Sequence, residues 1–427
     1  MKKKIFLSFL IFLTSFVSTH AMDLSVQAQQ HAKVPFLICT VGKKNKKLQA
    51  VAQRIQKDLG FTNQFAVSYK PLKKLESQSV VKGFYREGFP LVLFLKKGKG
   101  RKSIEWRLYD TQYATMLTGK NYIKRGASPS EWAHHIADAV WPLVTGQEGF
   151  FCTKVAYCKE VKKPGKKLLK YVYIADFDGS NEKLVVSTST INVAPRWNRD
   201  PDKPLLFYSE HTNKNVRLVM VNMKGHRKVV ANFDGMNMLP AFSPDGKQVV
   251  FCASRGGGHC QLYFYKKGQL KKLTRNNGNN ISPAFSDDGK TLFYCSDFET
   301  RNPQIYRYNF ATGTSQRLTN SGYCVSPSFC AKKNQLAYAK MVRGVMQIFV
   351  CDLNAKQHKQ LTFDAGNKEE CSWSACGNYL LFAVETRNES RLAMLNLNSN
   401  ARQFITAGKC VCCYPAWSCP YSNFAAA

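Results

Sequence analysis

The sequence predicts a mainly β protein, with a small N-terminal α/β domain followed by a six-bladed β-propeller that the C-terminal strand closes. Three observations lead to this fold class. Nearly the same phrase occurs twice, as "PAFSPDGKQVVF" from Pro240 and "PAFSDDGKTLFY" from Pro283. Related phrases recur every 43 to 45 residues and begin at 195, 240, 283, 327, 371 and 415. The last of these repeats breaks off after its first strand. This period is typical of propeller blades.

Each repeat reads as a four-stranded sheet. A proline is tolerated at the first residue of a strand, because its missing N–H removes no ladder hydrogen bond there. "PDG" (244–246) and "DDG" (287–289) supply the Asp and Gly that a tight hairpin turn needs. An aromatic residue stands two positions after each start, where we expect it to pack between neighbouring units: Trp197, Phe242, Phe285, Phe329, Trp373 and Trp417.

The final repeat has no residues left for strands two to four after "YPAWSCPYSNF". Upstream, three segments read as strands without a preceding start phrase: 153–158, 170–179 and 182–188. The two fragments complete one blade, and a ring closed in this way leaves no exposed sheet edge. We therefore expect the propeller to occupy 149–427.

Residues 22–148 show a different pattern, that of a small α/β domain. Strands are predicted at 33–42, 89–98 and 103–111, and helices at 46–60 and 128–146. The second helix begins with a capping box of Ser128 and Glu131 and has Pro129 in its first turn. Its predicted apolar stripe consists of Trp132, Ile136, Val140 and Leu143.

The first 21 residues have the organisation of a secretory signal peptide. A basic "MKKK" start precedes an apolar run of 13 residues, and cleavage is expected after Ala21. Such a run is too short to cross a bilayer, so we expect an exported protein that is not embedded in a membrane. Export also argues against a nucleic-acid partner, although the net charge is +34. The lysine runs indicate either a solvated basic surface or attraction to anionic envelope polymers or lipid headgroups.

Residue types used in catalysis occur without the spacing that their chemistry needs. No G-x-S-x-G elbow is present, and "CVCC" (410–413) lacks the paired spacing of zinc modules. His134 and His135 are neighbours on one helix and point about 100° apart. We therefore expect no enzyme, no metal site and no cofactor. Fifteen cysteines in an exported chain predict at least one disulfide.

The signal peptide, the α/β domain and the repeats together resemble the TolB family, the periplasmic propellers of the Tol–Pal envelope system. The most specific matches are "LVTGQEGFFCTKVAYC" (143–158), "YVYIADFDG" (171–179) and "PAWSCPY" (415–421). The resemblance implies a non-enzymatic, monomeric adaptor that binds the peptidoglycan-associated lipoprotein Pal and TolA, with other outer-membrane proteins as further partners. Such an adaptor would maintain outer-membrane integrity and support constriction at cell division.

In this family the Pal-binding face is built by loops that lead into the inner strands, and we expect those residues to lie outside the blade cores. The matching positions are Met236, Asn237, Leu239, Asn279, Asn280, Ile281, Tyr323, Cys324, Glu369, Glu370, Cys412, Cys413 and Tyr414. The matching TolA segment is Met22, Asp23, Leu24, Ser25 and Val26. The alternative function is that of a secreted carbohydrate- or peptidoglycan-binding propeller without Tol partners.

Overall fold

The computed structural model describes residues 33–420, except 75–76, 99–102, 124–127, 163–167, 256–257 and 267–268. The described residues belong to one compact unit. The expected signal peptide (1–21) and the expected TolA segment (22–26) lie outside them. Within the described part of the chain, no helix is long and apolar enough to cross a membrane.

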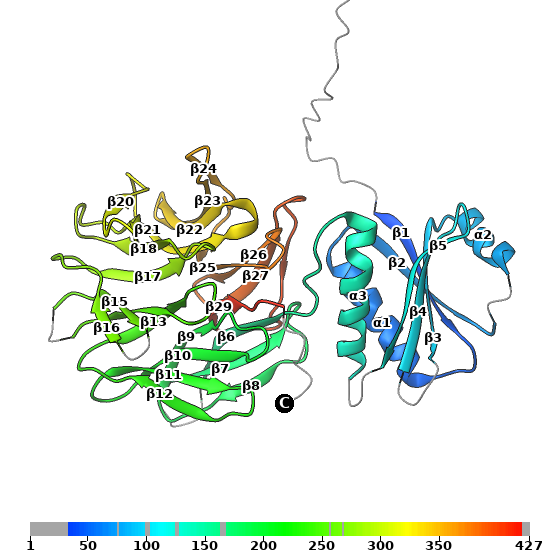
Figure 1. Cartoon of the computed structure of the whole chain (residues 1–427), viewed down its shortest axis with the longest axis horizontal. Coiled ribbons are helices and arrows are strands. Elements are labelled where there is room, and N and C mark those ends of the chain that lie inside the picture. The colour runs from blue at the N-terminus through cyan, green and yellow to red at the C-terminus, as the bar shows by residue number, and fades with distance from the viewer. Residues whose placement is uncertain are drawn as a thin grey trace, which may run out of the picture. The chain divides into compact units, whose positions relative to one another are not determined.

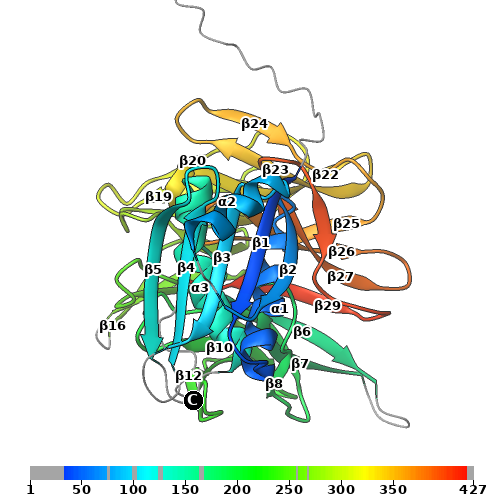
Figure 2. The same ribbon diagram turned by 90° about the vertical axis from the view of Figure 1, so that its right-hand side faces the viewer.

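The α/β domain is a five-stranded mixed sheet of order β2-β1-β3-β4-β5, which Figure 2 shows face on. The strand β1 pairs in parallel with β2 and β3, whereas β3, β4 and β5 form an antiparallel meander. Its elements are β1 (Val34–Val41), α1 (Lys46–Phe61), β2 (Phe65–Leu72), α2 (Gln78–Arg86), β3 (Leu91–Lys97), β4 (Ser103–Asp110), β5 (Thr115–Ile123) and α3 (Pro129–Thr145).

Local sequence explains where the two longer helices begin. Asn45 caps α1, its side chain accepting a hydrogen bond from the Leu48 N–H at 3.1 Å. The predicted capping box of α3 is present in both directions, since Ser128 Oγ accepts from the Glu131 N–H and Glu131 Oε2 accepts from the Ser128 N–H. The predicted stripe of α3 is wrong at Leu143, which is 53% exposed. The strands β2 and β5 and the helix α2 were not predicted.

Six four-stranded sheets follow, and they form the predicted six-bladed propeller. Five of them use four consecutive strands each. Their strands are β9 (Ile191–Trp197), β10 (Leu205–His211), β11 (Val216–Asn222) and β12 (Arg227–Ala231); β13 (Asn237–Phe242), β14 (Val249–Ala253), β15 (Gln261–Lys266) and β16 (Gln269–Lys272); β17 (Asn280–Phe285), β18 (Thr291–Ser296), β19 (Gln304–Asn309) and β20 (Ser315–Arg317); β21 (Cys324–Cys330), β22 (Gln335–Val342), β23 (Val345–Asp352) and β24 (Gln357–Gln360); β25 (Asn367–Trp373), β26 (Tyr379–Glu385), β27 (Ser390–Asn396) and β28 (Arg402–Phe404).

The sixth blade confirms the predicted closure by the last strand. Its order is β29-β6-β7-β8, with β29 (Cys412–Trp417) placed beside β6 (Lys154–Val161), β7 (Leu169–Asp176) and β8 (Lys183–Val186). Figure 1 shows β29 in red next to the green β6. The Trp417 indole N–H donates to Thr153 Oγ1 at 2.7 Å, and the Trp197 indole N–H donates to the Ala416 carbonyl at 3.0 Å. Side-chain bonds therefore tie β29 both to its own blade and to the next one.

Candidate functional site

The inner strands of all six blades line one pocket of about 150 Å³ in the propeller. Each inner strand carries a bulge at the same place, and a residue other than glycine adopts a positive φ there. These residues are Ala194, Leu239, Ser282, Ser326, Glu370 and Tyr414, with φ between 52° and 60°. A left-handed conformation costs such residues free energy, so its repetition six times shows that packing around the channel imposes it. Bulges of this kind redirect side chains beside binding sites.

Charged side chains connect separate blades across this pocket. Arg196 on β9 pairs with Glu370 on β25 at 3.2 Å. Ser326 on β21 donates its hydroxyl hydrogen to the other oxygen of the same carboxylate at 3.3 Å. The left-handed conformation of Glu370 thus places its carboxylate where two other inner strands provide donors.

Some of the expected partner-binding residues are buried, contrary to the expectation that they lie in loops outside the blade cores. Asn237 and Asn280 are the first residues of β13 and β17, and both are 0% exposed. The Asn237 amide donates to the carbonyls of Val216 and Phe233 at 2.9 and 2.7 Å. The same correction applies to two cysteines that are also 0% exposed, Cys324 and Cys412. A buried amide with all its bonds made inside the fold has nothing left to offer a partner.

A second group of the expected residues is half-buried: Leu239, Asn279, Ile281, Glu369, Glu370, Cys413 and Tyr414. Leu239 and Ile281 pack against the apolar cluster that contains Phe285, so they support the blades. Four of the group gather around another pocket, of about 160 Å³, which also contains Lys170: Glu369, Glu370, Cys413 and Tyr414. Burial and the nearby Glu370 raise the pKa of Glu369.

Two expected residues are exposed at the strand starts. Met236 is 45% exposed in the loop before β13, and Tyr323 is 39% exposed in the loop before β21. Two further exposed aromatics belong to the same end of the propeller and were missed by sequence reasoning. Phe298, 47% exposed, follows β18 and lies against Gly278 in the loop before β17. Phe363, 76% exposed, precedes β25. Neither belongs to the repeated phrase, so only its place in the fold identifies it.

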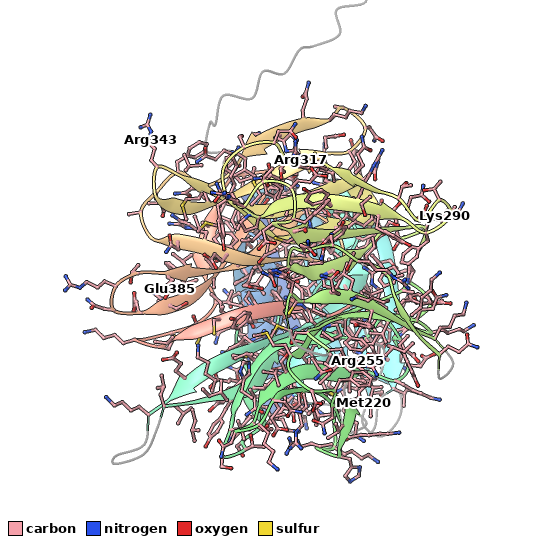
Figure 3. The ribbon with its side chains drawn as sticks, turned by 90° about the vertical axis from the view of Figure 1, so that its left-hand side faces the viewer. Met220, Arg255, Lys290, Arg317, Arg343 and Glu385 are labelled. Carbon is pink, nitrogen blue, oxygen red and sulfur yellow. The ribbon has the colours of Figure 1, made fainter. Side chains whose placement is uncertain are left out.

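Exposed basic residues occur at both ends of the propeller. Lys290 lies in the hairpin between β17 and β18, whereas Arg343 lies in the turn between β22 and β23, at the end where the inner strands begin. Figure 3 shows Lys290 and Arg343 projecting outward from the propeller, and both are exposed. Their position agrees with the interpretation of the lysine and arginine excess as a solvated surface.

His134 and His135 have separate surroundings, as their neighbouring positions on α3 require. His134 is 5% exposed, with Nδ1 at 2.9 Å from Asp58 and Nε2 at 3.1 Å from Asp176. His135 is half-buried, with Nδ1 at 3.5 Å from Cys152 Sγ. Among the described residues no group of three or more His, Cys, Asp or Glu side chains has the geometry to hold a metal ion.

None of the fifteen cysteines forms a disulfide in the structure, whereas the sequence predicted at least one. Most of them act as small apolar side chains in the blade cores. Cys252 and Cys295, for example, are 0% and 1% exposed, and Ala339 and Ala383 occupy the equivalent place in two other blades.

The geometry defines the class of protein as a six-bladed β-propeller joined to a small α/β domain, with a channel enclosed by six repeated bulges. The TolB β-propeller domain family matches residues 141–421. The chain therefore belongs to the TolB β-propeller family.

Individual relatives agree with this assignment. The chain is 31% identical over 165 residues to the Tol-Pal system protein TolB of Gluconobacter oxydans, and 29% identical over 202 residues to that of Rickettsia rickettsii. The matches cover 38% and 45% of this chain, but only 35% and 41% of the relatives' own length. The crystal structure of TolB from Acinetobacter baumannii has the same fold, with a TM-score of 0.78 and 24% identity over 91% of this chain and 97% of that one.

Proposed function

We propose that this chain is a periplasmic, non-enzymatic adaptor of the Tol–Pal system, and that it binds the lipoprotein Pal where the six inner strands begin. Membership of the TolB family supports the assignment of this chain to the Tol–Pal system, because the similar proteins of G. oxydans and R. rickettsii are named as Tol-Pal system proteins. A second contact, with TolA, is proposed for residues 22–26. Through these two contacts the chain would support outer-membrane integrity and constriction at cell division.

One observation carries the choice of face. Four consecutive blades each place at least one large exposed apolar side chain at the end where their inner strand begins: Met236, Phe298, Tyr323 with its neighbour Met341, and Phe363. Apolar groups gathered at one end of a protein mark an interaction surface. Beside a concave centre, a few such side chains are expected to supply most of the binding free energy.

The test is calorimetric titration of purified Pal into Met236→Asp and Tyr323→Asp variants. We expect each to weaken binding by roughly tenfold or more, because a carboxylate would be desolvated without a partner in the complex. Both side chains lie in loops and are exposed, so thermal unfolding should change little. Leu239→Asp or Ile281→Asp would be a poorer test, because those side chains pack against a blade core.

Matched controls are available on the α/β domain. Met116→Asp and Tyr113→Asp change the same residue types at exposed positions, where the side chains are 49% and 69% exposed. These variants should bind Pal as the wild type does. The proposal fails if the two propeller variants bind Pal normally, or if the controls weaken binding equally.

A further inference from the structure

One ladder position recurs in every blade, where a residue of the inner strand faces a residue of the second strand. The six pairs are Val193–Ser209, Met238–Cys252, Ile281–Cys295, Val325–Ala339, Glu369–Ala383 and Cys413–Cys158. In this set, cysteine faces cysteine in a single blade. That blade is the closing one, in which the last strand β29 meets the first propeller strand β6.

The placement of this pair satisfies the geometry of a disulfide. Directly opposed residues on antiparallel strands have Cα atoms about 4.5 or 5.5 Å apart, and a disulfide accepts about 4.4 to 6.8 Å. Cys158 and Cys413 both pack against the same apolar cluster around Trp197, so their side chains lie on one face of the sheet. A bond between them therefore requires no change of register.

The two sulfurs differ in access to solvent. Cys413 is half-buried and lines the pocket of about 160 Å³, whereas Cys158 is 0% exposed behind it. Lys170 also lines this pocket, with its Nζ 3.9 Å from Cys413 Sγ. An incoming reagent thus meets Cys413 first, beside a cation that favours the thiolate.

The two thiols also differ in the direction of their pKa shifts. The hydrogen bond with Cys158 lowers the pKa of the Cys413 thiol, and the charge of Lys170 lowers it further against the effect of burial. Burial raises the pKa of Cys158. Cys413 is therefore the nucleophile and Cys158 the resolving thiol, because the thiolate is the species that attacks.

We propose that Cys413 and Cys158 form a thiol–disulfide exchange site, at which a small disulfide oxidises the pair to a covalent bond between the first and last strands of the propeller. The Cys413 thiolate attacks one sulfur of the reagent and releases its other half as a thiolate. That thiolate takes the proton of Cys158, whose sulfur then attacks Cys413 and releases the second half, which is protonated by water. Two protein thiols are oxidised to one disulfide, and one disulfide reagent is reduced to two thiols.

The pocket also indicates which disulfides react fastest. Besides Lys170 its charged side chains are all carboxylates, namely Glu160, Glu369, Glu370 and Glu385. Glu160 pairs with Lys170 at 3.0 Å and Glu370 pairs with Arg196 at 3.2 Å, so the excess of negative charge around the opening comes from Glu369 and Glu385. A cationic disulfide such as cystamine should therefore react faster than the anionic glutathione disulfide, and added salt should reduce the difference.

The test uses the full chain and does not depend on the proposed partner. The reduced protein is incubated with cystamine or with glutathione disulfide, quenched by alkylation, digested and analysed by mass spectrometry. We expect a peptide pair linked through Cys158 and Cys413, formed faster with cystamine. The oxidised protein should melt about 10 °C higher, because the bond closes a loop containing most of the propeller. Lys170→Met should slow the reaction severalfold. The ammonium group of Lys159 pairs with Glu182 instead, so Lys159→Met is the control and should leave the rate unchanged.

Three outcomes would overturn the proposal. One is a pair that stays reduced with both reagents. Another is a bond between Cys410 and Cys412 in its place; their sulfurs lie 3.3 Å apart, but both belong to one chain segment and would not join β29 to β6. The third is an unchanged melting temperature in the oxidised wild type. All three readouts use the wild-type chain, so none of them depends on the folding of a variant.

Discussion

Replacing His134 by leucine should remove a charged bridge and, with it, a pH-dependent part of the stability. The imidazole connects three elements, because it lies on α3 between Asp58 of α1 and Asp176 of β7. The two carboxylates have other cations as well. Arg54 lies 2.9 Å from Asp58, and Lys154 pairs with Asp176. The variant therefore loses one cation of a network whose other members remain.

The magnitude follows from the ionisation of His134. Burial alone would lower its pKa, but the charge of Asp58 and the hydrogen bond with Asp176 raise it to about 9. An unfolded histidine titrates near 6.5, so the difference is worth about 3 kcal/mol of folding free energy. Because the folded pKa is the higher one, this contribution is complete below about pH 6.5 and is lost as the pH rises through 9.

The assay is urea unfolding of the wild type and of His134→Leu at pH 6 and at pH 9.5, followed by tryptophan fluorescence. The difference in unfolding free energy between the two proteins should be about 3 kcal/mol larger at pH 6 than at pH 9.5. His226→Leu is the matched control, since that histidine is exposed, and it should show no such change. Equal pH dependence in the wild type and in His134→Leu would refute the reasoning.

Two further predictions concern the propeller alone. A chain that ends at Lys409 lacks β29, leaving an open edge on β6, and should be insoluble or melt well below the full-length protein in a thermal scan; an unchanged melting temperature would contradict closure by β29. Asn280→Ala should lower the free energy of unfolding by about 2–3 kcal/mol in urea titration, because the amide donates to Gly278, Asn276 and Gln261 inside the fold. The exposed Asn302→Ala should change it by less than about 0.5 kcal/mol, and a similar loss in both would argue against a structural role for Asn280.

The propeller could be predicted from the sequence because the same sequence pattern recurs in most of its blades. A proline at the strand start and an aromatic two residues later recur at one period, and the missing strands of the last repeat indicated the closure by β29. In the α/β domain no such repetition exists. The unpredicted strands β2 and β5 are the two edges of their sheet. The strand β2 contains Pro71, which interrupts a strand pattern, and β5 has mostly exposed side chains.

For the candidate site, the sequence did not predict which of the expected side chains are exposed and which are buried. Asn237 and Met236 are adjacent in sequence, yet the first is fully buried and the second is 45% exposed. The difference arises from the carbonyls of Val216 and Phe233, which surround the Asn237 amide and come from another strand and a loop. Phe298 was missed for a similar reason, because only the folded blade brings it to the end where β17 begins.

The central claim is that one end of the propeller receives Pal, and hydrogen–deuterium exchange with and without purified Pal tests it most directly. We expect slower amide exchange in the loops that precede four inner strands, at 232–236, 273–279, 318–323 and 361–366. The hairpins that follow the inner strands, such as 243–248 and 286–290, should exchange at unchanged rates. Protection confined to those hairpins or to the α/β domain would contradict the assignment of the binding face.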